Sequence, residues 1–368
     1  MKGKVIGVLI VLLSIALLVG VAVVGAQQGE PPPRGQLISS RSDPAWQSLA
    51  RRGWSAERMQ NAKPYPMPAV EPGTDRGCGT GSGAPTGAPG LIPSGPEEVE
   101  YSLADVLGSI ERFPASAASP APLGYPYPPP YTRYEVFKKY TSWPYRTVGV
   151  LFFTQNGIDY RCSASSIGNH AIWTAGHCVS DGNGNWSYDL YWIPAYKNGA
   201  PAAGWAVWTP EYNLWTFTDW HLSGEWCRDS GGAVMYPEPK YGRKVSWVGW
   251  LGFAWNWPRV QHWHEIGYPS APPFDGNKMI ICASSHSRDD SDCLFADNPV
   301  AMGTGCDQTP GCSGGPWIKD FSGYSGAHNY LNGNFSFYYI GFPEEMFSPY
   351  FDDLSKDLWD LLVGDAPP

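Results

Sequence analysis

The chain has 368 residues, of which 43% are hydrophobic and 16% charged, and its formal net charge is -9. This length allows one large domain with extensions or two domains. The acidic balance, without a basic cluster, excludes the electrostatic footprint of a nucleic-acid-binding protein. The 43 glycines and 36 prolines favour many short strands joined by turns over long helices.

The chain begins with a pattern typical of a secretory signal. Two lysines among the first four residues precede an uncharged apolar run over residues 5–24, and small residues follow it up to Ala26. We therefore expect residues 1–26 to be a signal peptide cleaved after Ala26. The alternative is an uncleaved membrane anchor, because the run is long enough to span a bilayer. Under both interpretations the rest of the chain lies outside the cytoplasm.

The cysteines agree with export. An even number of cysteines in an exported chain predicts disulfides rather than metal ligands. No CxxC pair is accompanied by a second pair, so no zinc site is expected. The eight are Cys78, Cys162, Cys178, Cys227, Cys282, Cys293, Cys306 and Cys312.

Residues 27–132 do not have the pattern of a packed domain. Gly77–Gly90 is rich in Gly, Ala, Pro and Thr, and Ser116–Pro130 is rich in Pro, Ala and Tyr. Such tracts favour extended or flexible chain. Within them, Glu97–Phe113 has apolar residues at helical spacing and predicts one short helix. We interpret the segment as a propeptide or linker that is largely irregular, with a stalk as the alternative.

From about Tyr131 the pattern becomes that of an all-β domain, which we place at residues 133–368. Short apolar or alternating runs separated by Gly, Pro, Asn and Asp predict a β-sandwich or a pair of barrels. The leucines of Asp352–Val363 recur at helical spacing and predict a C-terminal helix. The predicted strand regions are Thr147–Thr154, Ala164–Ile167, Ala171–Thr174, Tyr188–Tyr196, Val245–Phe253, Lys278–Cys282 and Phe335–Ile340.

A first candidate for chemistry is His177, in the string Thr174–Cys178. It directly follows a predicted strand, and Cys178 can pair with Cys162 on the preceding strand. Such a bridge would fix the loop that carries the imidazole. A general base needs that fixed geometry as well as a pKa near neutral.

The second motif is Gly311–Pro316, with the sequence GCSGGP. If Ser313 attacks a carbonyl, the resulting oxyanion needs backbone N–H donors. Glycine at position 311 allows its N–H to turn toward that oxyanion without a side chain in the way. The Ser313 N–H would supply the second donor. Gly311 and Ser313 are therefore the predicted oxyanion hole.

The two motifs together resemble the chymotrypsin/trypsin superfamily of serine peptidases. The similarity is greatest to bacterial secreted peptidases of the glutamyl endopeptidase type, and it extends over residues 140–362 and not upstream. This resemblance implies two six-stranded antiparallel β-barrels. Weaker matches are Val148–Phe153, Cys162–Ser165, Ile193–Tyr196 with Gly199, and Pro349–Phe351.

The resemblance implies that an aspartate between the two motifs orients the imidazole, in the chain order His, Asp, Ser. Asp229 is the preferred candidate, because the residues after it resemble the strand that follows the family's aspartate. Asp219 is the runner-up, with Asp181 and Asp189 as further candidates.

Ser230 imitates a nucleophile, because Asp229–Gly232 reads Asp-Ser-Gly-Gly. The residue two positions before it is Arg228, which would obstruct an oxyanion hole, and no proline follows its glycine pair. We therefore reject Ser230 in favour of Ser313.

One departure from the family concerns activation. In trypsin-like zymogens an aspartate precedes the nucleophile and pairs with the new N-terminus, whereas this chain has Cys312. We expect a disulfide to fix that loop instead. One reasonable set is Cys282–Cys306 with Cys293–Cys312, and elimination then pairs Cys78 with Cys227.

Substrate preference is the least determined property. Asp307 lies six residues before Ser313, the spacing at which an aspartate in trypsin selects basic side chains. The alternative is a structural loop residue beside Cys306. Thr309, His328 and Asn334 are then candidates to line the pocket, where a hydroxyl and an imidazole would suit an acidic side chain.

The resemblance implies a secreted serine endopeptidase made as a zymogen, acting as a monomer on proteins or peptides without metal or cofactor. A membrane partner is expected only if the N-terminal segment stays uncleaved. The alternative class is an inactive protease-fold binding module that uses its aromatic surface, because ten of the 18 tryptophans lie between Trp205 and Trp263.

Overall fold

The computed structural model describes residues 35–43, 54–71, 87–95, 129–201, 211–290, 292–295, 297–323 and 328–367. The chain divides into the units Met1–Pro32 and Pro33–Pro368, and all described residues belong to the second. The expected signal segment, the helix over Glu97–Phe113 and Cys78 lie outside the described residues.

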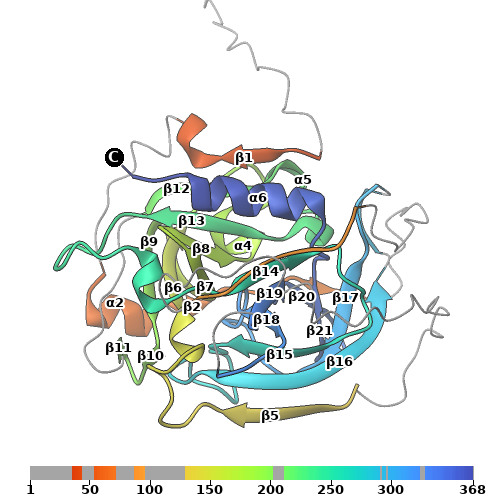
Figure 1. Cartoon of the computed structure of the whole chain (residues 1–368). Helices are drawn as coiled ribbons and strands as arrows, with labels where there is room; N and C mark the ends of the chain where they lie inside the picture. Colours follow the sequence, from red (N-terminus) through yellow and green to blue (C-terminus); the bar gives the residue numbers. More distant parts are fainter. Residues whose placement is uncertain are drawn as a thin grey trace, which may run out of the picture. The chain divides into compact units, whose positions relative to one another are not determined.

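The first of two large sheets has eight described strands in the order β1-β12-β13-β8-β7-β6-β9, with β2 paired to β7 (Figure 1). β6 and β7 pair over their length and are joined by Asn156 and Gly157, whose positive φ values suit a two-residue hairpin. The strands are β1 (Leu37–Ser39), β2 (Lys63–Pro64), β6 (Val148–Gln155), β7 (Ile158–Gly168), β8 (Ala171–Thr174), β9 (Tyr188–Pro194), β12 (Glu211–Phe217) and β13 (Gly231–Met235).

The second sheet has eleven described strands in the order β3-β20-β21-β17-β16-β15-β18-β19-β14-β4, with β5 paired to β16. A separate pair joins β10 (Tyr196–Lys197) and β11 (Ala200–Pro201). The strands are β3 (Ala69–Val70), β4 (Gly90–Ile92), β5 (Tyr131–Glu135), β14 (Gly252–Trp255), β15 (His262–Gly267), β16 (Ile280–Asp290), β17 (Ala301–Gly305), β18 (Pro316–Lys319), β19 (Tyr330–Asn334), β20 (Phe337–Tyr339) and β21 (Phe342–Ser348).

The helices are short except at the C-terminal end. α6 (Asp353–Gly364) begins at a capping box formed by Asp352 and Ser355, and it buries Leu358 and Leu362 in the main core. Capping and an amphipathic face are the usual requirements for a stable surface helix. The others are α2 (Ala56–Asn61), α4 (Gly176–Val179), α5 (Thr218–Ser223), and the 3-10 turns η1 (Ser40–Ser42), η2 (Tyr145–Thr147), η4 (Trp226–Arg228) and η5 (Val245–Val248).

The predicted all-β class and the C-terminal helix are confirmed. Six strands of the first sheet, β6–β9, β12 and β13, come from the predicted domain at 133–368, and the described pairings leave each sheet open. The upstream segment, expected to be largely irregular, adds the short strands β1, β3 and β4 at the ends of the sheets and β2 beside β7.

One strand prediction is wrong in part. Val245–Phe253 was expected to be one strand, but Val245–Val248 forms η5 and only Gly252 and Phe253 belong to β14. Val245 and Val248 pack in the core of the first sheet, so the apolar run reflects burial rather than extended chain.

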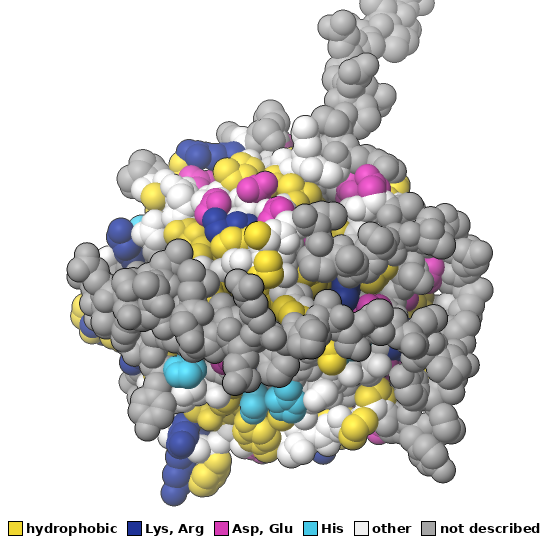
Figure 2. All heavy atoms as spheres, turned by 45° about the vertical axis from the view of Figure 1, so that its right-hand side comes forward, with side chains coloured by type: hydrophobic (Ala, Val, Ile, Leu, Met, Phe, Trp, Pro, Cys, Tyr) yellow, Lys and Arg dark blue, Asp and Glu magenta, His cyan; other side chains and the backbone are white. Residues whose placement is uncertain are grey.

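The surface of the described residues has mixed character. On the face shown in Figure 2, acidic and basic side chains lie among hydrophobic and neutral ones. No helix of the described residues is long and apolar enough to cross a membrane.

Candidate active site

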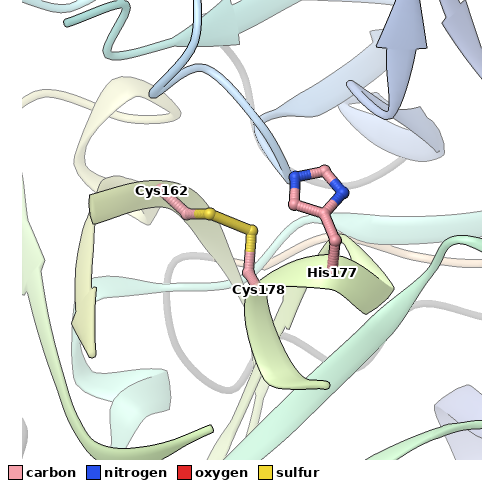
Figure 3. Close-up of side chains that lie close together, drawn as sticks. All are labelled: Cys162, His177 and Cys178. Carbon is pink, nitrogen blue, oxygen red and sulfur yellow. A yellow bond between two sulfur atoms is a disulfide. The ribbon is translucent and has the colours of Figure 1, made fainter. Parts of the chain in front are cut away.

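His177 lies on the short helix α4, which directly follows β8. The neighbouring residue Cys178 is bonded to Cys162 of β7, the predicted pairing (Figure 3). The side chain of His177 is 1% exposed. The disulfide therefore connects the turn that carries the imidazole to the adjacent strand of the first sheet.

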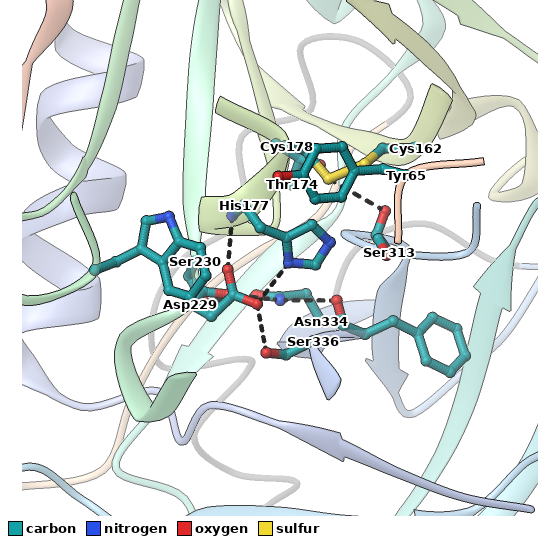
Figure 4. Close-up of polar contacts among 12 residues, drawn as sticks. Tyr65, Cys162, Thr174, His177, Cys178, Asp229, Ser230, Ser313, Asn334 and Ser336 are labelled. Atoms are coloured by element: carbon teal, nitrogen blue, oxygen red, sulfur yellow. Dashed lines mark hydrogen bonds and ion pairs between the residues drawn. A yellow bond between two sulfur atoms is a disulfide. The ribbon is translucent and has the colours of Figure 1, made fainter. Parts of the chain in front are cut away.

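The imidazole contacts the predicted acid. The Nδ1 atom of His177 lies 2.7 Å from Oδ2 of Asp229, and its backbone N–H donates to Oδ1 at 2.7 Å (Figure 4). An ionised carboxylate only accepts, so Nδ1 carries the proton and Nε2 is left as the acceptor. Ser336 donates its hydroxyl to the same Oδ2 at 2.5 Å. Three donors thus stabilise a carboxylate that is fully buried.

The loop of Ser313 is packed against the same strand β7. Ser163, next to Cys162, donates its N–H to the Ser313 carbonyl at 2.8 Å and its hydroxyl to the Gly311 carbonyl at 2.9 Å. Gly314 has a φ of 77°, and a Cβ there would lie 2.0 Å from Oγ1 of Thr174. Glycine at position 314 is therefore needed for the close approach of the loop to the first sheet.

The backbone donors predicted for the oxyanion hole are unused. In the part of the chain that the structure describes, neither the Gly311 N–H nor the Ser313 N–H donates to a protein acceptor. Likewise, Oγ of Ser313 and Nε2 of His177 are buried without a hydrogen-bond partner. The predicted nucleophile, the predicted base and the two predicted donors thus retain bonding capacity in segments that contact each other, since Sγ of Cys178 lies 3.9 Å from the Ser313 carbonyl.

The competing candidates have other roles. Ser230 donates its hydroxyl to Oδ1 of Asn334 at 2.6 Å, beneath the His177 pair. Asp219 accepts from the Gly35 N–H and from the Asn298 amide. Asp181 accepts from the amide of Asn185. Each of these side chains therefore forms hydrogen bonds with residues other than His177. The hydrogen bond of Ser230 agrees with its rejection as the nucleophile.

Two of the four expected disulfides are different in the structure. Cys282–Cys306 is formed as predicted, but Cys227 is bonded to Cys293. The expected pairs Cys78–Cys227 and Cys293–Cys312 are therefore wrong, and Cys312 is a buried free thiol.

The physical reason for the Cys227–Cys293 bond is that η4 and the β16–β17 connection lie together. Trp226 donates its Nε1–H to the Asp292 carbonyl at 2.7 Å, and Arg228 donates to the Asn298 side chain at 2.9 Å. The bond links the segment just before Asp229 to the second sheet. Asp229 is thereby fixed at the meeting point of the two sheets.

The residues expected to select the substrate contact different parts of the protein. Asp307 pairs with Arg133, and the Thr309 hydroxyl donates to the Ala271 carbonyl at 2.7 Å. Asn334 is buried beneath Asp229, and the His328 carbonyl accepts from Ser94. The side chains of Asp307, Thr309 and Asn334 therefore each have a partner within the protein, whereas the His328 contact is made by its backbone.

Three groups of side chains among the described residues are close enough to share an ion, but each contains a disulfide. Their cysteines are bonded to each other and offer no thiolate. The groups are Cys162, His177 and Cys178; Glu225, Cys227 and Cys293; and Glu265, Cys282 and Cys306.

Sequence reasoning missed three residues at the site. Ser163 fixes the serine loop, and Ser336 donates to Asp229. Tyr65, from the upstream segment, stacks on the imidazole of His177 with ring centroids 5.2 Å apart. Ser163 lies within the Cys162–Ser165 match and Ser336 within the wider span of the family resemblance, but nothing in the composition of the upstream segment indicated Tyr65.

No protein-family model and no curated protein matches the sequence. Among solved structures, a thermostable serine protease, AL20, from an extremophilic microorganism is 30% identical over 60% of this chain and 97% of its own, with a TM-score of 0.52. Protease Anisep from Arthrobacter nicotinovorans is 29% identical over 60% of this chain and 96% of its own, with a TM-score of 0.53. A Glu endopeptidase is 16% identical over 63% and 97%, with a TM-score of 0.48.

Proposed function

The chain belongs to the trypsin-like serine peptidases, and on this premise we propose that it is a secreted endopeptidase that uses His177, Asp229 and Ser313. The proposal is carried by the buried contact between Nδ1 of His177 and Oδ2 of Asp229. Among the described residues, neither Nε2 of His177 nor Oγ of Ser313 has a hydrogen-bond partner, and both atoms are buried.

In the proposed reaction, Oγ of Ser313 attacks the carbonyl carbon of a peptide bond while Nε2 of His177 takes the hydroxyl proton. Asp229 holds the imidazole in the required tautomer and stabilises the imidazolium. The N–H groups of Gly311 and Ser313 stabilise the oxyanion, and one such donor is worth about 100- to 1000-fold in rate. The imidazolium then protonates the leaving amine, and water hydrolyses the acyl-enzyme by the same route.

Secretion is the second part of the proposal. It is supported by the signal-like pattern of residues 1–26 and by three disulfides, which persist in oxidising compartments. We propose residues 1–26 as the signal, 27–132 as the propeptide and 133–368 as the peptidase domain. N-terminal sequencing of the exported protein tests the first boundary, and a start at Gln27 is expected.

The binding-module alternative is disfavoured by the tryptophans. Trp205 and Trp208 lie outside the described residues, and the other eight members of the group between positions 211 and 263 are buried or half-buried. Trp263 is fully buried and Trp220 is 5% exposed. A binding module that uses ring stacking needs exposed aromatic side chains, and none of these eight is in the exposed class.

Labelling with a serine-reactive fluorophosphonate, read by intact and peptide mass spectrometry, tests the proposed nucleophile. We expect one adduct, on Ser313, and none in Ser313→Ala. Ser230→Ala is the matched control and should label like wild type. An adduct that persists in Ser313→Ala would contradict the assignment. A peptide-library digest then identifies the residue preferred before the cut.

A further inference from the structure

Residues 54–71, hereafter the strap, pass from one sheet to the other. After α2, β2 pairs with β7 beside Tyr160 and Arg161 in the first sheet. Six residues after Lys63, β3 pairs with β20 beside Tyr338 and Tyr339 in the second sheet. The strap therefore adds a short strand to each sheet, a common mode of peptide recognition. Between the two strands, Tyr65 contacts the imidazole of His177, and Met67 joins the hydrophobic cluster that contains Cys312.

Tyr65 is the first residue of the strap after β2. Its N–H donates to the Arg161 carbonyl at 3.0 Å, and its hydroxyl donates to Oε1 of Gln155 at 2.6 Å. Its ring is stacked on the imidazole of His177 with an interplanar angle of 22° (Figure 4). One face of the imidazole proposed as the general base is thus covered by a side chain of the same chain.

Met67 is the next buried side chain of the strap, at 3% exposure. The following residue, Pro68, accepts from the Tyr338 N–H at 3.2 Å, which places Met67 beside β20. Its hydrophobic cluster includes Cys312, the residue before Ser313. The other buried members are Trp263, Cys282, Met302, Cys306, Trp317, Phe335, Met346 and Tyr350.

The site is closed with the strap in place. Ser313 is 0% exposed and His177 is 1% exposed. A carbonyl carbon must come to about 3–3.5 Å from the attacking oxygen. A peptide therefore cannot reach Oγ of Ser313 until a covering segment moves away.

The start of the strap is anchored by charge. Arg58 on α2 donates to Asp159 at 2.7 Å and to Asp189 at 2.5 Å, and it lies 3.9 Å from the ring of Trp54. Trp54 in turn donates its Nε1–H to the Asp189 carbonyl at 2.7 Å. The guanidinium side chain is only 18% exposed, so these ion pairs are partly desolvated and stronger than ordinary surface pairs.

We propose that the strap occupies the substrate cleft and keeps the folded full-length chain inactive, with Tyr65 over the base and Met67 beside the serine loop. This inference rests on the proposed function, because it assigns the cleft to the peptidase site. Activation then requires release of residues 54–71 rather than insertion of a new N-terminus.

The test compares fluorophosphonate labelling rates at Ser313 in intact full-length chains, scored only on the uncleaved mass. The strap variants are Arg58→Ala and the double variant Tyr65→Ala/Met67→Gly. Each variant removes contacts that should lower the ratio of strap-closed to strap-open chains by about tenfold or more. Labelling of Ser313 should therefore be about tenfold faster or more. Arg41→Ala is the matched control, because Arg41 also lies in the upstream segment and pairs with an aspartate, Asp365, but its side chain is 50% exposed. It should stay within about twofold of wild type.

The outcomes separate the two proposals. If strap variants label at the wild-type rate while Ser313 is labelled in all of them, the strap inference is overturned and the peptidase proposal stands. If no chain with an intact fold is labelled at Ser313, the peptidase proposal fails.

A binding measurement tests the strap without catalysis. A fluorescent peptide of residues 54–71 should bind the double variant carrying Ser313→Ala, measured by anisotropy, and should not bind the parent chain with its own strap. Equal binding to both chains overturns the inference.

Discussion

The two loops that bring His177 and Ser313 together are fixed by different means. The His177 turn is bonded covalently to β7 through Cys162–Cys178. The Ser313 loop, with the free thiol of Cys312, is held by hydrogen bonds to Ser163 of the same strand and by the Gly314 N–H, which donates to the Phe335 carbonyl at 2.8 Å. One strand therefore contacts both loops, and a covalent link to it is present at only one of them.

The largest expected effect lies on the histidine side. Asp229→Asn keeps the shape but reverses the preferred tautomer of His177, so kcat should fall about 10000-fold. Steady-state peptide hydrolysis by strap-released enzyme measures it. Asp219→Asn, which alters the runner-up acid, should keep kcat within about threefold, since its contacts are with Gly35 and Asn298. A comparable loss in Asp219→Asn would remove the assignment of Asp229.

Gly314→Ala tests the close packing of the serine loop. The added Cβ would lie 2.5 Å from the Ala175 nitrogen as well as close to Thr174, at a φ of 77°. We expect kcat/KM to fall about 100-fold, the effect of misplacing a nucleophile by about 1 Å. Gly323→Ala is the control, because nothing lies within 4 Å of its added Cβ. Equal activity of both variants would show that the loop tolerates displacement.

The double variant Cys162→Ala/Cys178→Ala removes the covalent link of the histidine side. The bond spans 16 residues, so the free energy of unfolding should fall by about 3 kcal/mol. Urea denaturation of the full-length variant and of full-length wild type measures this loss in the free energy of unfolding. An unchanged free energy of unfolding would mean that hydrogen bonds alone hold both the His177 loop and the Ser313 loop.

Cys312→Ala should have the smallest effect. Because the thiol makes no disulfide, the substitution removes only packing contacts. The free energy of unfolding should therefore fall by only about 1 kcal/mol. Burial raises the pKa of Cys312, which keeps the thiol protonated and unreactive at neutral pH. Native wild-type protein should therefore resist iodoacetamide at this position in peptide mapping. Modification of folded protein would instead place the thiol in a mobile loop.

Much of the candidate site could be predicted from the sequence because the features that indicate it are local. The short motifs around His177 and Ser313 contain the glycines and cysteines that shape their own loops. The strand-like run after Asp229 distinguished this residue from Asp219. The long amphipathic pattern of α6 was equally visible. These signals depend on adjacent residues and survive without knowledge of the tertiary structure.

The parts that could not be predicted depend on distant segments meeting. Cys227 finds Cys293, 66 residues away, because η4 packs on a remote connection. The strap contains strands of only two residues, Lys63–Pro64 and Ala69–Val70, which are too short to give a periodic pattern. Its order comes from the sheet edges it pairs with and from the Arg58 contacts, and none of these is encoded locally.

The attachment of the strap to the chain it covers has a kinetic consequence. A tethered occupant competes with free substrate at an effective concentration of about millimolar, whatever the dilution of the protein. A single backbone cut beyond Glu71 would abolish that advantage, and the fragment would then be lost by diffusion. On the proposed function, the onset of activity becomes a one-way event timed by a hydrolysis step, and later inhibition would require a different molecule.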